Sequence, residues 1–411
     1  MKKALLLSVV ASTMIMAGGD IAPVEPVVEA PVVASGWDFS GQAVLYYQTR
    51  DSSSLDLFDQ NSARANGGLQ LRAVNKDLAY GIGAGIEVTG LGTLGLQEDI
   101  VGGAMQYAGV GVGGWISQAY LTYGFGNTTL KAGRQELPKA LSPFAFSEGW
   151  NVFKNSFDAF LVVNTDIPDT TLVGAWVAKA NYNGVGAWMD EFYSTNPSGG
   201  TWGVSGWTGG TDMGIFMLTA QNKSIEDVTL TGTWYYANNL LFGPDDLNIL
   251  WGDAKFAVDS INVAVQGGAV MDDGFINNTT AFGAKIGTKL GMVDASLSYS
   301  HVNDGDFGVF NVGGVKTPLY TQMILNQGAI AYDNDTFVLR AGVAGLGGKF
   351  GLAYDYTNDQ SSSNNDYQEV DLTYKTKVFN DSTTLFAGYV YTDTDKADSQ
   401  NMLRFWARYN F

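Results

Sequence analysis

The stretch LRFWARYNF, residues 403–411, alternates between two kinds of side chain. Large or apolar residues hold the odd positions, whereas arginine, tryptophan and asparagine hold the even ones. Successive side chains of a β-strand point to opposite faces, so this pattern predicts a strand with one face for apolar surroundings and one for water. The same split recurs in residues 349–357 and 369–375.

The composition excludes several kinds of chemistry. The 411 residues include no cysteine and one histidine, His301, so disulfides, thiolate metal sites and multi-histidine metal sites are excluded. The formal net charge is −18, and such an acidic chain should repel nucleic acid. Hydrophobic residues nevertheless make up 45% of the chain and must be spread by alternation.

The first residues have the composition of a targeting segment. Lys2 and Lys3 precede an apolar stretch that ends at Ala17, which predicts a signal peptide over residues 1–17, cleaved near Ala17. Residues 18–36 are rich in proline, glutamate and valine and predict an extended linker in the periplasm. From Trp37 onward no apolar run is long enough for a spanning helix, so residues 37–411 are expected to form one β domain.

Alternation alone does not separate a soluble β-sandwich from a membrane barrel. A signal peptide and connections that alternate between short and long favour a transmembrane antiparallel up-and-down barrel, with short periplasmic turns and long outer loops. Eight turns are predicted at residues 75–78, 125–127, 165–169, 222–226, 259–260, 290–292, 346–348 and 380–381. Nine outer loops are predicted at residues 50–66, 90–113, 135–156, 181–211, 238–246, 272–278, 303–335, 358–366 and 393–399.

These connections join eighteen strands, an even number that puts both termini in the periplasm. Sixteen or twenty strands stay open, because residues 303–335 could hide two more. A barrel of this width can enclose an aqueous channel. In such a barrel the residues expected on the lipid side of the last strand, where they assist membrane insertion, are Leu403, Phe405, Tyr409 and Phe411.

The third outer loop, residues 135–156, is unusually apolar. It combines Pro138, Pro143 and four aromatic residues with the charged residues Lys139, Glu148 and Lys154. We expect it to fold into the lumen and narrow it, with packing on a neighbouring subunit as the alternative.

Charged residues at inward positions form two sets. The basic residues on or next to the strands are Arg72, Lys131, Arg134, Arg340, Arg404 and Arg408, and the acidic ones are Glu87, Asp158, Asp355, Glu369 and Asp371. Opposed walls of this kind would set a transverse field across a pore. The alternative is that each charge simply hydrates the lumen. Negative outer loops would give a slight preference for cations.

Catalytic and metal-binding functions have weaker support from the sequence. Ser300 and His301 suggest a barrel hydrolase, but neighbouring residues of a strand point to opposite faces and cannot form a catalytic pair with each other. We therefore expect no enzyme activity and no catalytic residues. Acidic loop residues at 303–306 and 393–398 offer oxygen ligands for calcium without the full spacing of a calcium loop, so we expect no cofactor.

The chain resembles the Opr family of outer-membrane porins, related to OprD-type channels and to the major outer-membrane porins of epsilon-class proteobacteria. The resemblance rests on the leader, residues 1–35, and on GWDFSG at 36–41, AGRQELP at 132–138 and NTDIPDTTLVG at 164–174. It implies an eighteen-stranded outer-membrane barrel, a constricting third loop and homotrimers. The expected partners are small hydrophilic solutes and ions, outer-membrane lipid and lipopolysaccharide, and the barrel-assembly machinery, which would bind the C-terminal strand. Substrate-selective transport is the alternative function.

Overall fold

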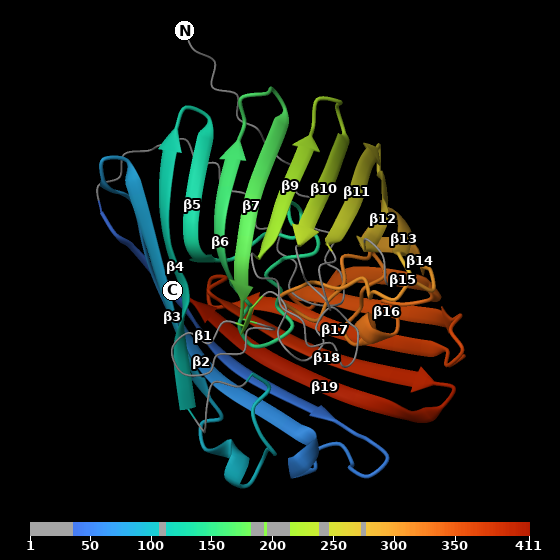
Figure 1. Ribbon diagram of the computed structural model, residues 1–411. Coiled ribbons are helices and arrows are strands. Elements are labelled where there is room, and N and C mark those ends of the chain that lie inside the picture. Colours follow the sequence, from blue (N-terminus) through green and yellow to red (C-terminus); the bar gives the residue numbers. More distant parts are fainter. Residues whose placement is uncertain (1–35, 107–111, 182–192, 195–213, 238–245, 273–276) are drawn as a thin grey trace.

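The computed structural model describes residues 36–106, 112–181, 193–194, 214–237, 246–272 and 277–411. Within them, nineteen antiparallel strands form one sheet that closes on itself (Figure 1). Eighteen strands have at least eight residues, and β8 (Tyr193–Ser194) is a two-residue strand that pairs only with the end of β7. The eighteen-stranded barrel predicted from the sequence is therefore confirmed.

The long strands are β1 (Asp38–Arg50), β2 (Ala63–Ala79), β3 (Ile82–Gly92), β4 (Val112–Phe125), β5 (Thr128–Gln135), β6 (Phe157–Asn164), β7 (Thr170–Ala180), β9 (Ile215–Asn222), β10 (Val228–Ala237), β11 (Leu247–Val258), β12 (Ile261–Asp272), β13 (Thr279–Leu290), β14 (Val293–Val302), β15 (Asn334–Gly345), β16 (Gly348–Asp359), β17 (Tyr367–Val378), β18 (Thr383–Thr394) and β19 (Ala397–Asn410). Short 3-10 helices lie at Gln60–Ser62, Leu96–Glu98 and Asn326–Gly328. The predicted signal peptide and nearly all of the linker lie outside the described residues, as do parts of four predicted outer loops.

The barrel closes where its first strand meets its last. β1 pairs with β19 over nine residue pairs, and Leu45 lies opposite Ala407. Next to this ladder, the Gly41 N–H donates to the Phe411 carbonyl at 2.8 Å, and the Phe411 N–H donates back at 3.0 Å. Closure leaves no long strand with an unpaired edge, which is the condition for placing a sheet in hydrocarbon.

The two faces of the wall differ in polarity as the alternation predicted. On β16, Leu352 and Tyr354 are 47% and 41% exposed on the outside, whereas Ala353 and Asp355 between them are fully buried on the inside. Polar inward positions and apolar outward positions are the pattern of a barrel surrounded by lipid. No helix among the described residues is long and apolar enough to cross a membrane.

All eight short turns are present, and one lies elsewhere than predicted. The turns at residues 165–169 and 259–260 have the predicted bounds. The turn predicted at 75–78 is wrong: β2 continues to Ala79, and the chain turns at Tyr80 and Gly81. The polar cluster at 75–77 instead forms an irregularity in the hydrogen-bond ladder between β2 and β3. There the Asp77 N–H donates to the Asn75 side chain, and the Gly81 N–H donates to the Asp77 carboxylate.

The two extra strands considered for residues 303–335 are absent. This segment forms an irregular loop containing the 3-10 helix Asn326–Gly328. Together with the third outer connection it fills much of the barrel interior (Figure 1). We call residues 135–156 loop 3 and residues 303–333 loop 7, after their order among the outer connections.

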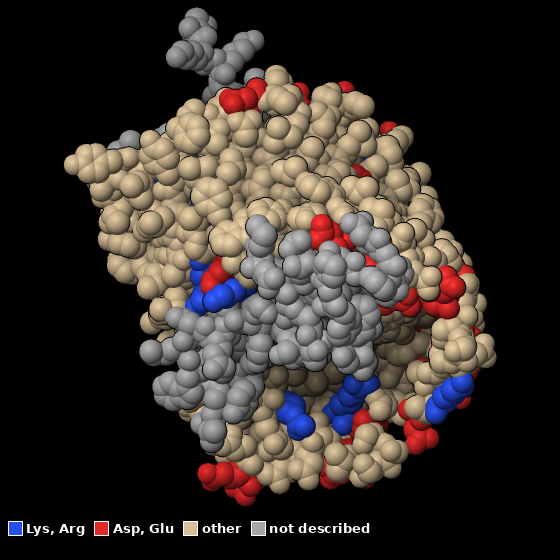
Figure 2. Space-filling model, in the orientation of Figure 1, with Lys and Arg blue, Asp and Glu red and all other residues tan. Residues whose placement is uncertain are grey.

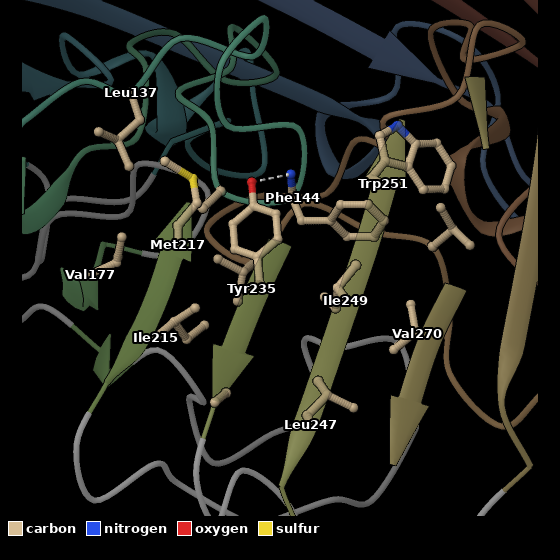
Figure 3. Close-up of a cluster of buried hydrophobic side chains, with 14 of the residues drawn as sticks. Leu137, Phe144, Val177, Ile215, Met217, Tyr235, Leu247, Ile249, Trp251 and Val270 are labelled. Atoms are coloured by element: carbon tan, nitrogen blue, oxygen red, sulfur yellow. Dashed lines mark hydrogen bonds between the residues drawn. The ribbon is translucent and has the colours of Figure 1, made fainter. Parts of the chain in front are cut away.

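A large apolar cluster lies inside the barrel, between loop 3 and the wall of β9 to β12 (Figure 3). Phe144 of loop 3 lies between Tyr235 and Trp251 of the wall, with ring centroids 6.0 and 5.1 Å away in edge-on geometry. The Phe144 N–H also donates to the Tyr235 hydroxyl at 3.1 Å. Apolar side chains fill this side of the lumen, so any path for water must run along another side.

Closure of the ring can be tested by cross-linking, because the chain has no native cysteine. Leu45→Cys combined with Ala407→Cys places two thiols directly opposite each other across β1 and β19. Opposed Cβ atoms lie about 4.5–5.5 Å apart, so oxidation should join the strands, seen as a reducible shift in gel mobility. The control pair Leu45→Cys and Leu403→Cys is four residues out of register, roughly 13 Å, and should not react. Equal reaction of both pairs would contradict the register.

Candidate functional site: the lumen between loops 3 and 7

Loop 3 crosses the lumen from one wall to the other. At one side the Leu141 carbonyl accepts a hydrogen bond from the Thr219 hydroxyl of β9 at 2.8 Å. At the other side the Arg408 guanidinium of β19 donates to the Val152 carbonyl at 3.0 Å. The loop therefore folds inward, as its apolar sequence predicted.

Loop 7 is held against the opposite wall by buried charges. Arg340 of β15 donates to the carbonyls of Tyr320 and Gln322 at 3.2 and 2.8 Å. Glu369 accepts from the Leu325 N–H at 2.8 Å, and Asp355 accepts from the Asn326 side chain at 2.7 Å. These wall charges anchor the loop.

The acidic wall predicted from the sequence is therefore not in contact with water. Asp355, Glu369 and Asp371 have no exposed surface, because residues 324–326 of loop 7 cover them. Arg340 is likewise buried under the same loop, at 4% exposure. These four residues lie at inward positions as expected, but they do not border the water path.

A carboxylate joins the two loops. Glu148 of loop 3 accepts hydrogen bonds from the Asn311 side chain at 2.7 Å and from the N–H groups of Val315 and Lys316 at 2.8 and 3.1 Å. Backbone contact continues at the Val312 N–H, which donates to the Phe144 carbonyl at 2.7 Å. Glu148 is 4% exposed, so these bonds form away from solvent and hold the loops as one unit.

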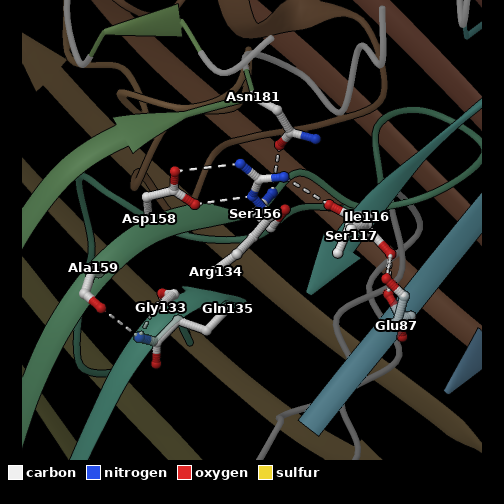
Figure 4. A network of polar contacts seen from close by, with 10 residues as sticks. All are labelled: Glu87, Ile116, Ser117, Gly133, Arg134, Gln135, Ser156, Asp158, Ala159 and Asn181. Carbon is white, nitrogen blue, oxygen red and sulfur yellow. Dashed lines mark hydrogen bonds and ion pairs between the residues drawn. The ribbon is translucent and has the colours of Figure 1, made fainter. Parts of the chain in front are cut away.

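The wall of β2 to β6 carries a polar network of predicted residues (Figure 4). Arg134 pairs with Asp158 at 2.9 Å and donates to the Ile116 carbonyl at the same distance. Gly133, which precedes Arg134, has φ +118°, in the left-handed region that favours glycine. Nearby, the Ser117 hydroxyl donates to Glu87 at 2.7 Å.

Two further cations lie on the same wall. Arg72 donates to the Tyr120 hydroxyl at 3.1 Å, and the Lys131 ammonium lies 3.9 Å from the centroid of the Tyr120 ring. Both side chains are half-buried and keep access to the lumen.

The β19 wall and the tip of loop 3 complete the border. Arg404 donates to the Gln48 side chain at 2.9 Å and lies 5.3 Å from the ring of Trp150 in loop 3. Lys154 of loop 3 pairs with Glu136 at 3.2 Å, with both side chains about 30% exposed. Loop 3 also packs against this wall, because Val152 and Phe153 lie in one apolar cluster with Val44 and Tyr46 of β1.

Cations dominate the half of the lumen nearest the short turns. The half-buried or exposed basic side chains at inward positions include Arg72, Lys131, Lys255, Lys285, Lys289, Lys349, Lys375, Lys377 and Arg408. The acidic side chains there include Asp253 and Asp294, which pair with Lys255 and Lys349. Figure 2 shows Lys and Arg side chains beside the hollow in the visible face, while many Asp and Glu side chains lie on its rim.

The four predicted residues of the last strand lie on the outside of the barrel. Phe405, Tyr409 and Phe411 are between 41% and 51% exposed, and Leu403 is half-buried.

Residues suggested for other chemistry do not form a site. The Ser300 side chain faces inward and bonds the Thr321 hydroxyl at 2.6 Å, whereas His301 lies 3.1 Å from Asp335. Across the described part of the chain, no group of three or more His, Cys, Asp or Glu side chains is arranged to hold a metal ion.

Sequence reasoning missed the role of loop 7. Residues 307–332 contain one charged residue, Lys316, and many apolar ones, which is the signal that identified loop 3. Searching both loops for long apolar stretches would have predicted that both fold into the barrel.

No family model and no curated protein matches the sequence. Solved structures do match. OccAB3 of Acinetobacter baumannii is 15% identical with a TM-score of 0.74, over 92% of this chain and 100% of that chain. OccK8 (OprE) of Pseudomonas aeruginosa is 13% identical with a TM-score of 0.71, over 91% and 98%. OccK3 (OpdO) of the same organism is 15% identical with a TM-score of 0.71, over 91% and 95%. These neighbours are outer-membrane channels of the OprD type, and at this identity the likeness establishes the fold.

The junction between the loops can be tested through Glu148. In Glu148→Gln an amide replaces the second carboxylate oxygen and cannot accept from the loop 7 N–H groups. Loss of a charged hydrogen bond of this kind costs about 1.5–3 kcal/mol. Loop 7 should loosen, and trypsin should cut faster after Lys316, the only Lys or Arg in the loop. Glu98→Gln, on the exposed second loop, is the control; equal cleavage of both variants would show that Glu148 does not join the loops.

Lys139 of loop 3 should make stability depend on pH. Burial, together with the ammonium groups of Lys316 and Lys255, lowers the pKa of Lys139 from 10.5 to about 7. Between those values the unfolded chain binds more protons than the folded chain, so the free energy of unfolding rises with pH. Lys139→Met removes this contribution, and its stability relative to the parent should be highest at pH 7 and decline toward pH 10.

Urea unfolding at pH 6.5, 8 and 9.5 measures this difference. Lys139→Gln, a second neutral side chain, should show the same decline, which separates proton release from changes in packing. Parallel pH profiles for the parent and both variants would contradict the assignment.

Proposed function

We propose that this protein is a porin of the bacterial outer membrane, a passive channel for small hydrophilic solutes and ions. The observation that carries the proposal is the inverted polarity of the barrel: an apolar outer wall surrounds an interior that holds charged side chains and two inward-folded loops. The fold shared with OprD-type channels supports the same function.

The charge along the passage favours anions over cations. The acids Asp355, Glu369 and Asp371 are sealed under loop 7, whereas Arg72, Lys131 and Arg408 keep access to the lumen. At physiological ionic strength a charge acts over about 8 Å, so these nearby cations outweigh the negative outer loops. We therefore propose a preference for anions, in place of the slight cation preference expected from the negative outer loops.

Selective passage of particular solutes is the second candidate. The observation in its favour is that loops 3 and 7 are tied to the wall and to each other, which would fix the lining of the channel. A barrel hydrolase has no comparable support, since Ser300 and His301 have separate partners.

Several partners belong to the same proposal. The signal peptide would be removed near Ala17, and the barrel-assembly machinery would bind the outward residues of β19. Lipid and lipopolysaccharide would surround the wall, and three copies would assemble. Native mass measurement in detergent tests the last point: a mass of three chains supports it, and a mass of one chain contradicts it.

Passive permeation is tested in liposomes. Liposomes that contain the purified protein should swell in iso-osmotic solutions of small sugars, and planar bilayers should show discrete current steps proportional to voltage. A protein that inserts and folds but gives neither result would contradict the proposal.

Ion selectivity is tested by reversal potentials in a salt gradient. The parent channel should prefer chloride to potassium, and Lys131→Gln combined with Arg408→Gln should lower the permeability ratio severalfold, because two lumen charges are removed. Lys396→Gln, on the exposed hairpin between β18 and β19, should leave the ratio unchanged. Cation preference in the parent would overturn the charge assignment but not the channel itself.

A further inference from the structure

Every short turn of the barrel presents a large apolar side chain to the surroundings. The most exposed are Tyr80, Leu346 and Phe379, at 95%, 87% and 78%. The other five turns carry such residues at 52% exposure or more, namely Phe125, Ile167, Ile225, Val258 and Met292. We call these eight residues the apolar rim.

The backbone at three rim positions is unfavourable for the residues that occupy it. Tyr80, Leu346 and Phe379 have φ of 54°, 51° and 53°, in the left-handed region that bulky residues rarely adopt. Hairpin turns of this kind normally use Asn, Asp or Gly there. A large apolar side chain at these places opposes local turn preference, so turn formation does not explain it.

Short hairpins at the opposite end of the barrel lack this feature. The connection between β16 and β17 has the sequence QSSSNND at residues 360–366, and β18 and β19 are joined by Asp395 and Lys396. Neither contains an apolar residue. A connection that is short and exposed therefore does not by itself require an apolar residue.

The rim is continuous with the apolar outer wall. On β13, Phe282, Ile286 and Leu290 lie at outward positions with exposures of 49%, 49% and 66%, with Ala284 and Thr288 between them, and Met292 lies in the turn beyond. Val258 likewise holds the last outward position of β11 before its turn. No charged side chain lies at the outward positions of these two strands between the wall and the turns.

We propose that the apolar rim inserts into the boundary between headgroups and acyl chains of the periplasmic leaflet and holds the turn end of the barrel at that depth. The inference rests on the barrel crossing the outer membrane. Isolated apolar side chains distributed around the barrel opening can each insert into fluid lipid. A folded protein would instead need one contiguous apolar patch, and it would cover the opening of the barrel. Amphipathic and apolar side chains at this depth gain burial while the adjoining turn backbone stays hydrated.

Fluorescent labels test the depth of the rim directly. Leu346→Cys and Phe379→Cys each give a single cysteine, which is labelled with bimane in folded protein in phosphatidylcholine vesicles. Ser362→Cys, in the polar hairpin between β16 and β17, is the matched control. Lipids with a nitroxide near the headgroup should quench the two rim labels severalfold more than the control, and aqueous iodide should quench the control severalfold more than the rim.

The opposite ranking would overturn the proposal, since it would place the rim in water, where a periplasmic macromolecule could reach it. Current steps from the same labelled variants keep this outcome separate from the channel assignment. Channels that conduct normally while their rim labels are quenched by iodide refute the anchoring alone.

A second set of variants uses the turn geometry. Asn tolerates the left-handed backbone better than Tyr, Leu or Phe, so Tyr80→Asn, Leu346→Asn and Phe379→Asn together should relieve the turns. If the rim anchors the barrel, the folded fraction in vesicles nevertheless falls severalfold relative to Asp381→Asn, as read from the heat-dependent gel shift. An equal or higher folded fraction would contradict anchoring.

Discussion

The backbone hydrogen bonds of a barrel must all be made within the sheet, and this requirement governs the whole molecule. In hydrocarbon an unpaired N–H or carbonyl costs several kcal/mol, so a sheet with free edges is excluded. The ladder between β1 and β19 removes the edges by joining strands that are more than 350 residues apart in sequence. Once the ring is closed, alternation assigns one face of every strand to the outside and the other to the lumen.

A ring of eighteen strands is wide, and its interior has to be narrowed by something other than the wall. Loops 3 and 7 do this, and the charges at their junctions stabilise them there. Arg340, Asp355 and Glu369 would be costly as isolated buried charges, but each has hydrogen-bonding partners in loop 7. Glu148 performs the same role between the loops. The charges that remain in contact with water are then mostly basic, which sets the proposed preference for anions.

Alternation and turn chemistry predicted the strands well because both act within a few residues. Seven of the eight turns and the inward fold of loop 3 followed from local sequence. The displaced turn near Asn75 was not predictable in this way, because a polar cluster can form either a turn or an irregular ladder. Burial of the acids depends on contacts with a loop more than twenty residues away in sequence. Such long-range contacts leave no periodic signal in the sequence.

In the orientation described above, odd-numbered residues of the last strand contact lipid, while their even-numbered neighbours face the lumen. Single nitroxide labels at positions 402–410, in protein reconstituted into bilayers, measure this through collisions with lipid-soluble oxygen and a water-soluble nickel chelate. Oxygen accessibility should be high at 403, 405, 407 and 409 and low at 402, 404, 406 and 408. Uniform accessibility, or a dry environment at the odd positions, would contradict it.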